Sequence, residues 1–123
     1  MQRWIGKLSE KFYALMRVIF GLLYACHGGQ KILAMFYEGS MEPSPLLVAA
    51  GVIELAGGIL IAVGLFAQYA AFIASGEMAV AYFMMHAPRG FWPIKNGGEL
   101  AVLFCFAFLY ITAKGPGPFA LKK

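Results

Sequence analysis

The chain has 123 residues, of which 61% are hydrophobic and 13% are charged, and its formal net charge is +4. Its mean hydropathy of +0.72 is far above that of an ordinary soluble domain, and so short a chain could not bury this much apolar surface in water, which excludes a soluble fold. The basic residues fall at segment ends and at the termini without a basic run or stripe, so no nucleic-acid partner is expected.

Four hydrophobic segments follow one another along the chain, each near the length of about 20 residues that a membrane-spanning helix requires. The predicted spans are residues 12–34, 46–66, 68–87 and 97–113. We therefore expect an all-α integral membrane protein, a four-helix antiparallel bundle in which residues 1–123 form a single membrane domain in contact with the lipid bilayer.

Turn-forming residues separate these spans. The first two are joined by a polar loop with Pro43 and Pro45, neither of which can continue a helix. Only Gly64–Gln68 separates the second span from the third, which predicts a tight helical hairpin. Pro88 ends the third span, and Asn96 is placed to cap the fourth.

Lysine and arginine residues predict the orientation of the spans. Lys31, Arg89 and Lys95 lie at one side of the predicted bundle. The residues near the termini, on the other side, are Arg3, Lys7, Lys11, Lys114, Lys122 and Lys123. Cytoplasmic ends of membrane helices carry the excess of positive charge, so both termini of this multi-pass protein are expected in the cytoplasm.

Three charged side chains are expected deep within the predicted spans, where a charge costs roughly 2.5–3.5 kcal/mol and needs a partner or a purpose. We expect Arg17, Glu54 and Glu77 at depths of about 8 to 18 Å from the inner edge, close enough for one intramembrane charge network. Such a network either fixes helix packing alone or leaves one carboxyl with a proton for chemistry or transport, because one arginine cannot neutralise both. Glu54, Glu77 and Glu99 are the candidate catalytic, proton-handling carboxyls.

A second polar group is predicted near the outer face, at the ends of the first and third spans and the start of the fourth. Its candidate ligand-binding residues are His27, Lys31, His86, Arg89 and Asn96. Cationic side chains beside a helix N-terminus suit an anion or a quinone carbonyl. Alternatively, long basic side chains at a wet interface reach toward lipid headgroups without forming a site. No metal is expected, because the two histidines lack a local ligand-pair motif.

Glycines recur at helical spacing in the first two spans. Gly21 and Gly28 share one face of the first span, and Gly51 and Gly58 share one face of the second. Small residues at such positions let two helices approach closely, so these glycines are interpreted as packing residues.

The polar and glycine positions form an ordered set along the chain. The set comprises Arg17, His27-Gly28-x-x-Lys31, Gly51-x-x-Glu54-x-x-Gly57-Gly58, Glu77…Ala81…His86, Asn96-Gly97-Gly98-Glu99 and Gly115-Pro116-Gly117. In order and spacing, over nearly the whole chain, it resembles the DoxX family of small four-helix membrane proteins. The resemblance implies a plasma-membrane protein of bacteria or archaea. Members include a membrane subunit of a thiosulfate:quinone oxidoreductase and a partner in oxidative-stress complexes, which implies a link to redox chemistry without choosing a reaction.

Three functions are expected from these features. The first is a redox-associated subunit, without a redox cofactor motif of its own, that holds a quinone or a small sulfur anion near the outer face and works with a soluble oxidoreductase or sulfurtransferase. The second is a non-enzymatic adaptor that anchors a soluble partner. The third is a proton-coupled carrier of a small solute, which the lack of a clear inverted repeat disfavours. A homo-oligomer, a dimer, is expected because four helices of this size do not easily surround a cavity.

Overall fold

The computed structural model describes residues 1–122, which are helical apart from turns, loops and one isolated backbone bridge between Leu65 and Lys122. The N-terminal helices are α1 (Gln2–Ile5), the 3-10 turn η1 (Gly6–Leu8) and α2 (Ser9–Phe36). They are followed by α3 (Pro45–Val63), α4 (Ala67–Ala81), the π-helical η2 (Tyr82–His86), the 3-10 turn η3 (Ala87–Arg89), α5 (Pro93–Asn96) and α6 (Glu99–Lys114).

Three helical stretches are long and apolar enough to cross a membrane, namely Gln2–Phe36, Pro45–Val63 and Ala67–Arg89. The fourth predicted span corresponds to α6, whose 16 residues are fewer than the roughly 20 that a bilayer core ordinarily requires. The all-helical fold is therefore confirmed, with three helices of membrane-spanning character. The fourth crossing and the orientation of the termini stay predictions.

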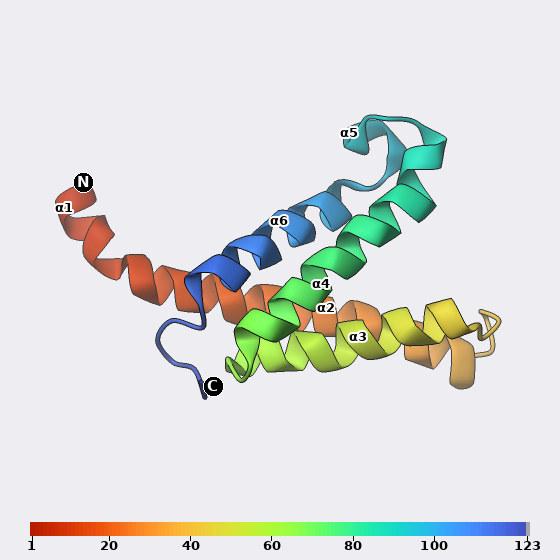
Figure 1. The fold of residues 1–123 in the computed structure, drawn as a ribbon, viewed down its shortest axis with the longest axis horizontal. Helices are drawn as coiled ribbons and strands as arrows, with labels where there is room; N and C mark the ends of the chain where they lie inside the picture. The colour runs from red at the N-terminus through yellow and green to blue at the C-terminus, as the bar shows by residue number, and fades with distance from the viewer. Residues whose placement is uncertain (123) are drawn as a thin grey trace.

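The long helices form two pairs, α2 with α3 and α4 with α6 (Figure 1). The pairs meet near the turn at Gly64 and the C-terminal tail, residues 115–122, and they diverge toward the opposite end (Figure 1). We call the first of these the tail end. The opposite end, which holds loops 37–44 and 90–98, is called the loop end. A gap therefore opens between the two pairs on the side of the loops.

The α2–α3 pair is held together by contact between glycines. A methyl group added at Gly21 would lie 2.7 Å from the carbonyl oxygen of Gly58, and one added at Gly28 would lie 2.7 Å from that of Gly51. Within each helix the two glycines are about two turns apart, so both contacts fall on one face of the pair. The predicted role of these glycines in close helix packing is confirmed.

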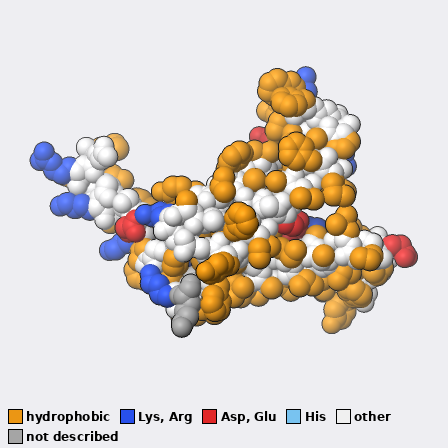
Figure 2. Space-filling model, in the orientation of Figure 1, with side chains coloured by type: hydrophobic (Ala, Val, Ile, Leu, Met, Phe, Trp, Pro, Cys, Tyr) orange, Lys and Arg blue, Asp and Glu red, His pale blue; other side chains and the backbone are white. Residues whose placement is uncertain are grey.

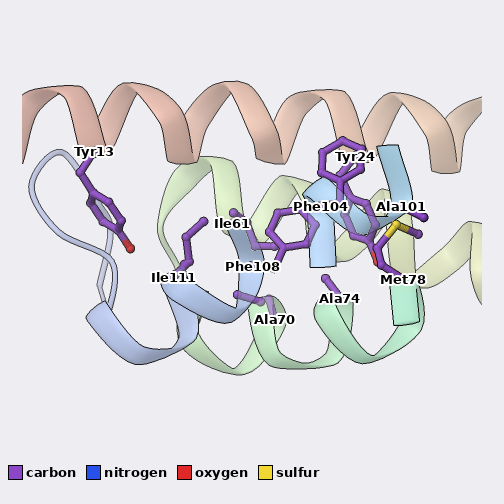
Figure 3. Close-up of a cluster of buried hydrophobic side chains, with 11 residues drawn as sticks. Tyr13, Tyr24, Ile61, Ala70, Ala74, Met78, Ala101, Phe104, Phe108 and Ile111 are labelled. Atoms are coloured by element: carbon purple, nitrogen blue, oxygen red, sulfur yellow. The ribbon is translucent and has the colours of Figure 1, made fainter. Parts of the chain in front are cut away.

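An aromatic core lies where the two pairs meet (Figure 3). Tyr24 is fully buried, and its ring packs edge-on against Phe108, which is stacked on Phe104 with 5.4 Å between ring centroids. Ile61 and Ile111 complete the core toward the tail end. Lipid chains are as apolar as these side chains, so the core is stabilised in a bilayer by packing contacts rather than by exclusion of water.

The outward-facing side chains are mostly large and apolar. Leu15 and Leu22 of α2, Phe72 and Ile73 of α4 and Phe106 of α6 are all exposed. Figure 2 shows hydrophobic side chains spread over both helix pairs. This surface suits contact with lipid chains, in accord with the sequence composition.

Candidate functional site

A cavity of about 730 Å³ lies between the two helix pairs and reaches the loop end. Its walls are mostly apolar, with Leu47 and Ile53 on α3, Met78 on α4, Met84 on η2 and Phe104 on α6. We call it the loop-end cavity. Figure 2 shows acidic and basic side-chain atoms where the two arms of the molecule meet. The volume is that of a site for a small organic molecule.

Five of the predicted site residues line this cavity. His27 and Lys31 come from α2, Glu54 from α3, Glu77 from α4 and His86 from η2. The sequence predicts two separate groups for these residues, an intramembrane charge network and an outer ligand-binding group. The structure brings them together at one site, because the gap between the helix pairs reaches from the loops to the depth of the two carboxyls.

Lys31 and Glu54 form an ion pair across the α2–α3 contact. The ammonium nitrogen lies 2.6 Å from Oε1 of the carboxylate. Helical side chains lean toward the N-terminus of their own helix, so in antiparallel helices these two lean toward each other. They meet near the contact of Gly28 with Gly51. The Lys31 side chain is 30% exposed, whereas that of Glu54 is 1% exposed.

Glu77 continues this polar chain into the core. The Tyr24 hydroxyl donates a hydrogen bond of 2.8 Å to Oε1 of Glu77. The Glu77 carboxyl also interacts electrostatically with Glu54 and with Lys31. Two interacting carboxyls thus share one ammonium, an arrangement that can hold one exchangeable proton between the carboxyls.

The two histidines lie on opposite walls of the cavity. The His27 ring packs edge-on against Phe104, with 6.0 Å between centroids. His86 ends the π-helical turn, and its Nδ1 is buried without a hydrogen-bond partner among residues 1–122. Single π-turns inside membrane or soluble helices are frequent at functional sites. Within the same described range, no three His, Cys, Asp or Glu side chains are placed to hold one metal ion.

Glu99 and Arg89 do not line the cavity. Both are exposed at the loop end, Glu99 in the first turn of α6 and Arg89 at the end of η3. An acidic residue in a first turn interacts favourably with the helix dipole, which accounts for Glu99 without a ligand. The structure therefore separates these two residues from the other predicted site residues.

Asn96 organises the loop that precedes α6. Its Nδ2 donates to the Tyr82 hydroxyl at 3.0 Å and to the Gly90 carbonyl oxygen at 2.9 Å, and its Oδ1 accepts from the Gly98 N–H at 2.8 Å. The side-chain amide is thus fully engaged by protein groups. The predicted cap of the fourth helix is wrong, because Gly98 is the N-cap of α6 and no side chain caps it; Asn96 ends α5 and holds the turn to Gly98 instead.

Arg17 lies at the tail end, away from the cavity. Its guanidinium is fully buried, and neither ion pair in residues 1–122 includes it. All its hydrogen-bond acceptors are backbone carbonyl oxygens, those of Ile61, Ala62, Pro116, Pro118 and Phe119. The carbonyl groups of Ile61 and Ala62 lie at the C-terminus of α3, which carries partial negative charge, and those of Pro116, Pro118 and Phe119 in the tail complete the set of acceptors for this cation. The structure does not join Arg17 to Glu54 and Glu77 in one network; Lys31 is their cationic partner.

Tyr24 is a site residue that is not among the residues predicted from the sequence. It lies on the face of α2 that also carries Gly28 and Lys31, and it is both the hydrogen-bond donor to Glu77 and part of the cavity wall. A buried tyrosine hydroxyl needs a partner, and a carboxyl was predicted at similar depth. A tyrosine and a carboxyl at similar depth in neighbouring helices are therefore the sequence signal from which this hydrogen bond could have been predicted.

Comparison with known proteins identifies the family. The DoxX family model matches residues 12–87, a segment that contains every polar residue of the loop-end cavity. The chain is also 44% identical to a protein of Haemophilus influenzae described as "Uncharacterized protein", with 95% of this chain and 92% of that protein covered. No solved structure matches. With its apolar helices and this match, the chain is a membrane protein that belongs to the DoxX family.

Proposed function

We propose that this protein is a redox-associated subunit of the bacterial plasma membrane that holds a quinone or a small sulfur anion in the loop-end cavity. The proposal includes a soluble partner, an oxidoreductase or sulfurtransferase, because the sequence has no flavin or haem motif through which the chain itself would exchange electrons. A homodimer is part of the same proposal.

One observation carries the proposal: a cavity with mostly apolar walls is also lined by six ionisable side chains, those of Tyr24, His27, Lys31, Glu54, Glu77 and His86. Ligand sites typically combine a large apolar lining with a few polar groups that fix the orientation of the ligand. Here Phe104 and the methionines offer contact to a flat ring or chain. Lys31 and the two histidines offer donors to a polar head. A molecule with an apolar body and an oxygen-bearing head fits both parts.

The membrane arrangement follows from the same proposal. We propose four crossings with both termini in the cytoplasm, so that the loop-end cavity faces the outer side. Arg17 fixes the C-terminal tail to the end of α3, which keeps the tail at the membrane side where α2 begins. This supports an even number of crossings, with α6 as the fourth.

Mass spectrometry of co-purified small molecules tests the proposal. The protein is purified in mild detergent, its bound molecules are extracted, and titration with an added short-chain quinone or thiosulfate measures binding directly. Two variants are compared with the wild type. Ala49→Phe places a ring in the cavity at an exposed lining position, and Glu99→Gln changes an exposed residue outside it.

The expected result is that the wild type and Glu99→Gln retain or bind the ligand, while Ala49→Phe loses it and remains folded by circular dichroism. Retention of ligand by Ala49→Phe would place the ligand elsewhere. If the wild type carries only lipid and binds neither thiosulfate nor the short-chain quinone in its oxidised or reduced form, the ligand-binding role is rejected and the adaptor function is favoured.

A further inference from the structure

We infer that the loop-end cavity selects a neutral ligand with a hydroxyl hydrogen-bond donor, such as a dihydroxy aromatic head, over an anion or a head with carbonyl acceptors alone. The inference rests on the proposed function, since it concerns the ligand of the same cavity. It is based on which polar atoms of the cavity already have a hydrogen-bond partner within the protein and which do not.

The Glu54 carboxyl supplies the main observation. Its side chain is 1% exposed, and Oε1 is paired with Lys31 at 2.6 Å. Its Oε2 is buried and has no hydrogen-bond partner among residues 1–122. Leaving a buried acceptor unpaired costs about 1–3 kcal/mol, and more when the group is charged. Because Glu54 lines the cavity, a ligand hydroxyl can supply the missing donor.

The other ionisable groups around the cavity are accounted for element by element. From α2, the Tyr24 hydroxyl already donates to Glu77 and Lys31 already pairs with Oε1 of Glu54, while His27 packs against Phe104. α4 contributes Glu77, and α6 contributes no ionisable residue to the lining. A protonated Glu77, whose carboxyl interacts with that of Glu54, can donate to Oε2, and this is the rival explanation.

A second unpartnered atom lies on the other helix pair. Nδ1 of His86 is buried without a partner among the same residues, and His86 lines the cavity from η2. Glu54 and His86 thus offer two free polar positions on opposite walls. A ligand with two hydroxyl groups offers a partner to each of these atoms, because imidazole nitrogen accepts or donates according to its tautomer.

Charge argues against an anion at this end of the cavity. Two carboxyls face one ammonium there, so an anion would meet like charge unless both carboxyls were protonated. A quinone carbonyl accepts hydrogen bonds and cannot donate one to Glu54. Sites built for a hydroxyl discriminate against analogues that lack it, because the buried polar group then stays unpaired.

Anaerobic binding measurements with matched probes test the inference. Isothermal titration calorimetry of the wild-type protein in detergent compares a short-chain ubiquinol, the corresponding ubiquinone and thiosulfate. We expect the ubiquinol to bind at least about tenfold more tightly than the ubiquinone, because only the ubiquinol can donate a hydrogen bond to Oε2 of Glu54. Thiosulfate is expected to show no binding in the same concentration range.

Two variants assign the preference to Glu54. Glu54→Gln keeps the size of the side chain and replaces an acceptor oxygen by an amide donor, so it should abolish or reverse the preference for the ubiquinol. Glu99→Gln, at an exposed residue outside the cavity, should keep it. The comparison of probes on the wild type stands alone if the Glu54 variant does not fold.

The outcomes separate this inference from the proposed function. Equal or tighter binding of the ubiquinone or of thiosulfate overturns the inference and leaves a ligand site in place; equal binding of both quinone forms is the result expected if Glu77 donates to Oε2 permanently. If none of the three probes binds, the proposed ligand-binding function itself fails, and the inference fails with it.

Discussion

The Lys31 ammonium lies 2.6 Å from Oε1 of Glu54, and the two residues approach each other from helices that touch through Gly28 and Gly51. The glycine contacts fix the register of α2 against α3, and that register brings the two side-chain ends together. Packing by residues with no side chain thus determines where the charged groups of the loop-end cavity lie.

Breaking this ion pair on one side is predicted to destabilise the protein. Lys31→Met leaves the Glu54 carboxyl buried without its cation, which should cost about 3 kcal/mol. The double variant Lys31→Met with Glu54→Leu should recover most of the loss, since an apolar pair needs no compensation. Unfolding equilibria in detergent micelles measure both.

The pair Lys114–Glu10, at 2.8 Å, is the natural control for that experiment, because both side chains are substantially exposed. Lys114→Met should change the unfolding equilibrium much less than Lys31→Met, because its partner Glu10 is exposed and the contact of Lys114 with the Tyr13 ring is a weak one. Equal effects of Lys31→Met and Lys114→Met would contradict the importance assigned to the buried pair.

Neighbouring glycines of α2 should respond in opposite ways to the same substitution. A methyl group at Gly28 would collide with the backbone of α3, whereas one at Gly29 would meet no atom within 4 Å. Gly28→Ala should destabilise by about 1–3 kcal/mol through overpacking. Gly29→Ala should be neutral, or stabilising by up to about 1 kcal/mol, because alanine favours the helix. The same unfolding measurement distinguishes them, and a neutral Gly28→Ala would show that the helix contact adjusts freely.

The helices and the glycine contacts were predictable from the sequence, because they depend on local hydrophobicity and on spacing along one helix. The predicted hairpin turn also appears at Gly64, which adopts a left-handed conformation with φ of 75° at the end of α3. Glycine reaches that conformation without the steric cost of a side chain. Such features are encoded in a few adjacent residues.

The site was predictable only in part, because it depends on how the helix pairs diverge. Comparable depths in straight, parallel helices predict one network of Arg17 with the two carboxyls. In the structure its partners are carbonyl oxygens of α3 and of the C-terminal tail, whose return to the bundle has no signature in hydrophobicity. Lys31, assigned at first to the outer group, reaches Glu54 because long side chains extend along their helix.

Arg17 is predicted to fix the C-terminal tail to the bundle. Arg17→Lys keeps the positive charge but cannot reproduce five hydrogen bonds to five carbonyl groups, because an ammonium has three donors. We expect residues 115–122 to exchange backbone hydrogens faster in this variant, while exchange in α4 is unchanged. Hydrogen exchange followed by mass spectrometry reads both segments at once. Unchanged exchange in the tail would show that its backbone bonds to Val63 and Gly64 suffice.

The position of the two termini gives the last prediction. Tyr13, near the start of α2, donates to the Gly115 carbonyl oxygen at 2.6 Å, so the end of α6 lies at the membrane side where α2 begins. We therefore predict that α6 crosses, although 16 residues span only about 24 Å against a hydrocarbon core of about 30 Å. Local thinning of the bilayer and snorkelling of Lys114 can accommodate the difference.

Reporter fusions in a bacterial host test this arrangement. Alkaline phosphatase is active only outside the cytoplasm, and it should be active when inserted at Gly39. This residue is exposed in the first loop, and a Cβ atom added to it would meet no other atom within 4 Å. It should be inactive when fused after Lys122, where green fluorescent protein should instead fluoresce. An active phosphatase at both positions would mean that α6 does not cross. The contacts of Tyr13 and Arg17 with the tail would then be incompatible with the membrane-embedded protein, since they hold both ends of the chain on one side.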